Sequence, residues 1–71
     1  MDAKTILKEE AEKSKSSPPQ YSTERHGGLD HHPGFTAIVR DSSGNVGEGV
    51  GRSKKEAEKD AAATLIKKRG V

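Results

Sequence analysis

The chain has 71 residues, which is room for one small domain. Only 28% of the residues are hydrophobic, and the net charge of +2 excludes a uniformly basic chain, so nucleic-acid binding would need local clusters of charge. The absence of cysteine excludes disulfides and fits an intracellular protein, cytoplasmic or nuclear. No apolar run reaches membrane-spanning length, so we expect no membrane partner.

The first predicted element is a helix over residues 3–14, with Asp2 as its N-cap. Apolar residues recur at helical spacing in a narrow stripe: Ala3, Ile6, Leu7 and Ala11. Pro18 and Pro19 follow the helix and force an extended connection.

Three strands are predicted after this helix. A weak strand covers residues 20–26, the clearest covers residues 35–40, and the third covers residues 46–51. Residues 27–34 form a turn-rich loop between the first two strands, and residues 41–45 form a hairpin connection.

Glycines line one face of the third strand: Gly47, Gly49 and Gly51. Glycine weakens a strand, so we expect a helix to approach this face closely. The following helix carries small residues and one leucine at matching spacing: Ala57, Ala61, Ala62 and Leu65.

The order of these elements predicts an α+β fold of the type α-β-β-β-α, a three-stranded antiparallel sheet with two helices packed on one face. We place a single domain at residues 2–69 and treat residues 70–71 as a tail. The expected core is thin: Ile6, Leu7, Tyr21, Phe35, Ala37, Val39, Ala57, Ala61 and Leu65.

The start of the second helix carries two cations. Ser53 and Glu56 have the spacing of a capping box, so this helix must begin at Lys54. Lys54 and Lys55 then lie at the positive end of the helix dipole, which costs about 0.3 kcal/mol or more. This arrangement predicts an anion-binding site, and a lysine pair that serves only solubility is the alternative.

In order along the chain, these features resemble the double-stranded RNA-binding domain of ribonuclease III, Dicer-type enzymes and many regulatory proteins. The resemblance spans residues 2 to about 68, and its specificity comes from the ordered spacing of several groups. The groups are Lys4-Thr5-x-Leu7-x-Glu9, Pro19-x-Tyr21, Gly28-x-Asp30-His31-x-Pro33-x-Phe35-Thr36, Gly47-Glu48-Gly49-x-Gly51-x-Ser53-Lys54-Lys55-x-Ala57-Glu58 and Ala61-Ala62.

The resemblance implies binding of double-stranded RNA with little dependence on sequence. Such a domain spans about 16 base pairs of A-form duplex, touching two minor grooves and the phosphates of the major groove between them. Three separate surfaces are therefore needed. The residues that the resemblance assigns to them are Thr5, Lys8, Glu9, Asp30, His31, Pro33, Arg52, Lys54, Lys55 and Lys59.

Thr5, Lys8 and Glu9 correspond to the surface that enters the first minor groove. The Glu9 carboxylate can accept a hydrogen bond from a 2′-hydroxyl, which DNA lacks. A solvated surface glutamate is the alternative. Lys8 stands where the family often has glutamine, and lysine, which cannot accept a hydrogen bond, favours phosphate attraction.

His31, with backbone groups near Asp30 and Pro33, corresponds to the surface that enters the second minor groove. A structural role for His31 inside its loop is the alternative. The three histidines do not have the spacing of metal ligands and no cysteine accompanies them, so we expect no metal and no cofactor.

Lys54 and Lys55 correspond to the surface that meets phosphates across the major groove, where Arg52 and Lys59 add charge. Glu58 stands where many strong binders have a third lysine. It shares the helix face of the lysine pair, and we expect it to pair with them and partly screen their charge.

The sequence excludes the common nucleotide-binding motifs. A phosphate loop that ended at Gly51 would need a glycine at position 46 and a lysine at position 52, where this chain has Val46 and Arg52. The glycine pattern of dinucleotide-binding proteins also fails, because its third glycine is absent. The chain also lacks the clustered carboxylates of ribonuclease III catalysis. We therefore expect a binding module of a larger RNA-processing or regulatory protein, without catalysis or a small-molecule substrate.

A diverged family member that serves mainly protein contact or dimerisation is the alternative function. Ile38, Val46 and Val50 would form a modest apolar patch on the sheet face away from the helices, and the third strand would offer an open edge. The two functions use opposite faces and can coexist.

Overall fold

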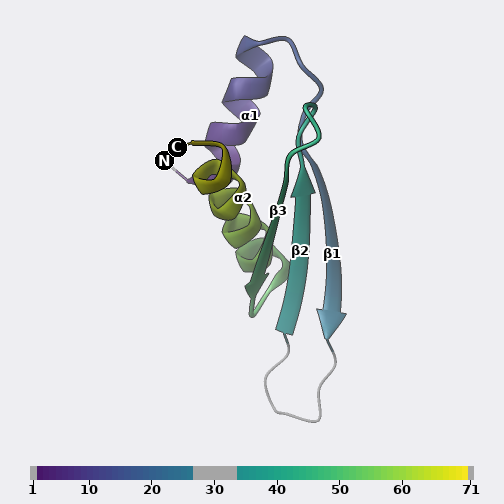
Figure 1. Cartoon of the computed structure of the whole chain (residues 1–71). Coiled ribbons are helices and arrows are strands. Elements are labelled where there is room, and N and C mark those ends of the chain that lie inside the picture. The colour runs from purple at the N-terminus through teal and green to yellow at the C-terminus, as the bar shows by residue number, and fades with distance from the viewer. Residues whose placement is uncertain (1, 27–33, 71) are drawn as a thin grey trace.

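The computed structural model describes residues 2–26 and 34–70. Its elements follow the order α1 (Ala3–Lys13), β1 (Gln20–His26), β2 (Gly34–Arg40), β3 (Val46–Gly51) and α2 (Lys54–Gly70) (Figure 1). Every predicted helix and strand is present. The first helix ends one residue earlier than predicted, and β2 begins one residue earlier.

The three strands form one antiparallel sheet in the order β1-β2-β3. Both helices lie on the same side of this sheet (Figure 1), so the predicted α+β architecture is confirmed. α2 covers β3 and β2, whereas α1 packs mainly against α2. Neither helix in the described part of the chain combines the length and the hydrophobicity that a membrane span requires.

Asp2 caps the first helix, as predicted. Its Oδ1 atom accepts hydrogen bonds from the backbone N–H groups of Thr5 at 3.2 Å and Lys4 at 2.9 Å. These bonds satisfy first-turn donors that have no partner within the helix. The bond from Thr5, with the bond from Lys4 and the nearby lysine charges, holds the pKa of Asp2 below its ordinary value despite its partial desolvation.

A left-handed residue ends α1. Lys15 has a φ of 55°, and its N–H donates to the carbonyl of Glu12 at 3.2 Å. The N–H of Ser16 donates to the carbonyl of Ala11 at 2.9 Å. Together these bonds form a Schellman motif, which turns the chain toward β1.

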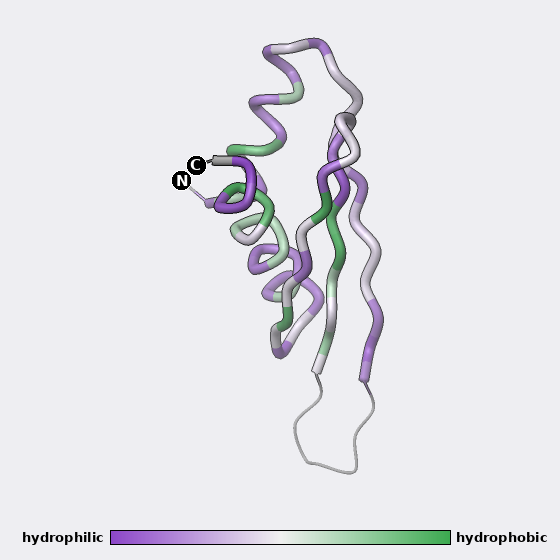
Figure 2. Tube along the Cα trace, in the orientation of Figure 1, coloured by the Kyte–Doolittle hydropathy of each residue, from purple (hydrophilic) through white to green (hydrophobic). Residues whose placement is uncertain are grey.

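The core lies between α2 and the inner face of the sheet. Its buried residues are Leu7, Ala37, Val39, Ala57, Ala61, Ala62 and Leu65. Tyr21 and Phe35 pack at its margin, and Ile6, which we predicted to be a core residue, is only half-buried. This difference follows from α1 packing on α2, which turns Leu7 inward. Figure 2 shows hydrophobic residues on β2 and α2, while β1 is almost entirely neutral or hydrophilic.

The backbone of α2 approaches the glycine face of β3 too closely for any side chain. A Cβ atom on Gly49 would lie 2.1 Å from the Ala61 nitrogen. At Gly47 it would lie 2.6 Å from the Ala61 carbonyl oxygen, and at Gly51 it would lie 2.6 Å from the Ala57 nitrogen. These neighbours are backbone atoms, which cannot rotate away. The close approach that the glycine spacing predicted is therefore confirmed.

Replacing the central glycine should separate α2 from the sheet. We expect Gly49→Ala to lower the free energy of unfolding by about 3 kcal/mol, because the new methyl group overpacks the core. Denaturant unfolding followed by circular dichroism measures this. Gly34→Ala is the control, since a Cβ there meets no described atom within 4 Å. Equal stability of the two variants would show that the helix can move away at little cost.

Candidate nucleic-acid interface

α2 begins at Lys54, as the capping box predicted. The Ser53 Oγ accepts a hydrogen bond from the Glu56 N–H at 3.1 Å. The Glu56 carboxylate accepts from the Arg52 N–H at 3.1 Å, one residue before the usual partner in a capping box. These two bonds hold the first turn of α2 against the residues that precede it. The backbone N–H groups of Lys54 and Lys55 are those that a helix leaves for an external acceptor.

The lysine pair at this helix start is exposed, as are Arg52 and Lys59. The prediction that Glu58 pairs with Lys54 and Lys55 is wrong. Glu58 is half-buried, and its carboxylate binds the Lys4 ammonium of α1 at 2.6 Å. The lysine pair has no ion-pair partner among the residues that the structure places. Its charge is therefore available to an external anion.

Lys4 joins three elements at one point. Its ammonium binds Glu58 of α2 and lies 5.0 Å from the centre of the Tyr21 ring of β1. This distance is typical of a cation–π contact. Burial, with the negative charges of Glu58 and Asp2, raises the pKa of Tyr21. The contact fixes the N-terminal half of α1 against both layers of the domain.

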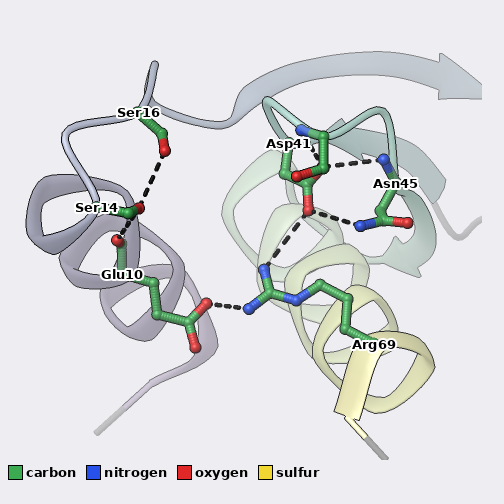
Figure 3. Close-up of polar contacts among 7 residues, drawn as sticks. Glu10, Ser14, Ser16, Asp41, Asn45 and Arg69 are labelled. Atoms are coloured by element: carbon green, nitrogen blue, oxygen red, sulfur yellow. Dashed lines mark hydrogen bonds and ion pairs between the residues drawn. The ribbon is translucent and has the colours of Figure 1, made fainter.

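Arg69 fixes the other end of α1. Its guanidinium binds the carboxylate of Glu10 and lies 3.6 Å from the Asp41 carboxylate (Figure 3). Asp41 also accepts from the N–H groups of Ser43 and Asn45, each at 2.9 Å. Burial raises the pKa of Asp41, but the bonds from Asn45 and Ser43 and the charge of Arg69 outweigh this effect and lower it overall.

The exposed side of α1 carries the residues predicted for the first minor groove. Lys8 and Glu9 are exposed and Thr5 is half-buried. Asp30, His31 and Pro33 lie outside the described residues. The second residue of β2 lies opposite the last residue of β3, since Phe35 pairs with Gly51. The described start of β2, where the predicted loop ends, and the start of α2 therefore lie at the same end of the sheet (Figure 1).

The histidines and the β3 edge are the other features that the sequence raised, and two of the three histidines, His31 and His32, lie outside the described residues. His26 bonds the Thr36 hydroxyl, and no metal-type cluster of His, Cys, Asp or Glu occurs in the described part of the chain. On the edge of β3, the N–H of Val50 donates to Asp60 at 2.9 Å. The prediction that this edge is open is therefore only partly right.

Sequence comparison identifies the family. A family model described as double-stranded RNA binding motif matches residues 3–69. The chain belongs to this family. The matched residues include α1, the three strands and α2, and the predicted binding of double-stranded RNA by a module of this fold is confirmed.

Related sequences include ribonuclease 3 of Mesorhizobium japonicum, 46% identical over 70 residues, and ribonuclease 3 of Sinorhizobium medicae, 43% identical over 70 residues. The alignments cover 99% of the domain but only 32% and 29% of these relatives. The domain thus spans about a third of the length of the curated relatives it matches, and the remaining parts of those proteins have no counterpart in it.

Solved structures give the same fold. A structure of Arabidopsis HYL1 matches with a TM-score of 0.76 and 28% identity, covering 97% of this domain and 96% of that chain. The second double-stranded RNA-binding domain of DRB4 matches with a TM-score of 0.69 and 33% identity, covering 100% of both chains.

Sequence reasoning missed the contacts that hold α1. Glu10 interrupts the apolar stripe of α1, and a carboxylate at that place indicates a polar contact with a neighbouring element. Its partner, Arg69, and the second carboxylate, Asp41, could not be identified without the tertiary arrangement. The same holds for the pairing of Lys4 with Glu58.

The Asp41 contacts should make stability depend on pH. The pKa of Asp41 is lower in the folded state, so its charge stabilises the fold above the unfolded value of 3.8, and this effect is lost as pH falls through the folded pKa. We expect Asp41→Asn to cost about 1 kcal/mol at pH 7 and less at pH 3. Denaturant unfolding at the two pH values measures this. A cost that does not change with pH would contradict a role for the charge.

Proposed function

We propose that this domain binds A-form RNA at three points, with the start of α2 as the phosphate-binding surface. This proposal rests on Lys54 and Lys55, which are exposed and have no ion-pair partner among the residues that the structure describes. The capping bonds of Ser53 and Glu56 hold the first turn, and the free N–H groups of the lysines complement their ammonium charges. Arg52 and Lys59 extend this surface across the major groove.

Thr5, Lys8 and Glu9 of α1 contact the first minor groove in this proposal. A carboxylate is repelled by phosphates but can accept hydrogen bonds from 2′-hydroxyls, so Glu9 favours RNA over DNA. Two salt bridges join α1 to α2: Lys4 with Glu58 and Glu10 with Arg69. They support this groove contact because they fix the distance between α1 and the lysine pair at the start of α2. A groove contact of this kind depends on spacing, because the duplex is rigid.

The contact with the second minor groove is assigned to Asp30, His31 and Pro33 by family resemblance alone. Gly34 and His26, which flank this segment, end the β2–β1 pairing at the end of the sheet where α2 begins. That position is compatible with one duplex reaching both surfaces.

We place the domain in a larger, intracellular RNA-processing protein. The similarity to ribonuclease 3 sequences supports a nuclease as the parent, with catalysis in another part of the chain. A second role in protein contact is compatible with the outer sheet face, where Val50 is 65% exposed and Ile38 is 40% exposed.

RNA selectivity and the phosphate surface can be tested in one titration series. We expect a duplex RNA of about 16 base pairs to bind more tightly than DNA of the same sequence, and affinity to fall with salt. Replacing both lysines (Lys54→Ala with Lys55→Ala) should weaken binding at least about tenfold and reduce the slope of log affinity against log salt by about 2.

The charge-matched control is Arg40→Ala with Lys67→Ala, because both cations are exposed, Arg40 on the outer face of the sheet and Lys67 in the last turn of α2, away from the proposed interface. This control should bind nearly as the parent does. Equal affinity for RNA and DNA would contradict the minor-groove contacts. Equal losses in the two double variants would show that Lys54 and Lys55 act only through net charge.

A further inference from the structure

The two edges of the sheet differ in their available backbone groups. On β3, α2 covers the edge: Asp60 accepts from the Val50 N–H at 2.9 Å, and the Lys68 ammonium donates to the Val46 carbonyl at 3.3 Å. Glu48 lies between them and adds an exposed charge. These are features that prevent a strand from pairing with another chain.

The edge of β1 lacks such cover. The backbone N–H of Val50 points away from β2, so Val50 and the facing Thr36 are not a hydrogen-bonded pair. The N–H and C=O groups of Thr36 must therefore point toward β1, where Thr36 faces Glu24. Alternation along β1 then turns the N–H and C=O groups of Tyr21, Thr23 and Arg25 to the outside. No other described residue bonds these groups, and β1 stands on the side of the sheet farthest from α2 (Figure 1).

We propose that β1 pairs with β1 of a second copy of this chain, antiparallel and about a two-fold axis at Thr23. Thr23 then faces Thr23, and Tyr21 faces Arg25 on either side of the axis. The outward N–H and C=O groups of all three residues become bonded in a standard antiparallel ladder. The strand order becomes β3-β2-β1-β1-β2-β3, with the helices of both copies on one face.

The sequence of β1 is self-complementary in this register. Glu24 faces the small polar Ser22, and Arg25 faces the Tyr21 ring, which suits a cation–π contact. Centring the pair on Glu24 would instead oppose two carboxylates, and centring it on Ser22 would leave part of the strand unpaired. The Thr23-centred register is therefore the one that uses all 7 residues of β1 without like charges opposed.

Pairing through β1 leaves the proposed phosphate-binding surface available. Lys54 and Lys55 are exposed at the start of α2, which packs mainly on β3, at the opposite side of the sheet from β1 (Figure 1). A dimer would bring two such surfaces to one long duplex, which raises affinity by increasing effective concentration. The pairing itself needs no RNA, so it goes beyond the proposed function and can be tested apart from it.

Engineered cysteines test the position of the axis, because the chain has no cysteine of its own. Facing Cα atoms in a hydrogen-bonded pair lie about 5.5 Å apart, within the roughly 4.4–6.8 Å that a disulfide spans. In glutathione buffer without RNA, we expect Thr23→Cys to form a covalent dimer. Glu48→Cys on the β3 edge is the matched control and should remain a monomer. Equal dimer yields for the two variants would overturn the proposal.

Sedimentation of the unmodified chain tests the equilibrium. We expect the average mass to rise toward a dimer with concentration, and Thr23→Pro to weaken the dimer about tenfold, because it removes a central donor. Proline is compatible with the fold here since the Thr23 N–H faces outward, and Glu48→Pro on β3 is the control. A parent chain that stays monomeric at every concentration overturns the proposal, whether or not it binds RNA. If Thr23→Pro does not fold, the comparison of Thr23→Cys with Glu48→Cys still tests the proposal.

Discussion

The close approach of α2 to the glycine face of β3 is the constraint on which the rest of the domain depends. Gly49 lies so near Ala61 that no side chain fits between the two backbones. The chain has few large hydrophobic residues, so the core is filled by close packing of two backbones instead of by large side chains. Alanines on α2 contact glycines on β3, and Leu65 is one of the few large buried side chains. The helix cannot slide along the strand without a steric clash, so the position of its first turn is set.

That position connects the core to the proposed RNA-binding surface. Ser53 caps α2 where β3 ends, so Lys54 and Lys55 are presented at a fixed point beside the sheet. α1 is then placed by α2, through Lys4 with Glu58 and Glu10 with Arg69, both partners on the second helix. The arrangement also explains why a glutamate at position 58 leaves the charge of the lysine pair intact: Glu58 neutralises Lys4 and holds α1.

Local patterns predicted most of the fold. The caps at Asp2 and Ser53 located both helix starts, and the glycine alternation in β3 predicted the approach of α2. What the sequence could not predict was which charge pairs with which. Glu58 has lysines one turn before it on its own helix but pairs with Lys4 across the helix interface, and the role of Arg69 depends on three segments that meet only in the fold. Such contacts depend on tertiary geometry, which residue spacing does not encode.

Amide chemical shifts recorded during titration with a duplex RNA of about 16 base pairs test the central claim most directly. The claim is that the glycine-fixed start of α2 and the exposed side of α1 form one rigid RNA-binding surface. The account predicts the largest changes together at Lys54, Lys55 and Glu9, with little change at Ile38 and Val50 on the opposite face. Changes concentrated at Ile38 and Val50, with none at the lysine pair, would contradict it.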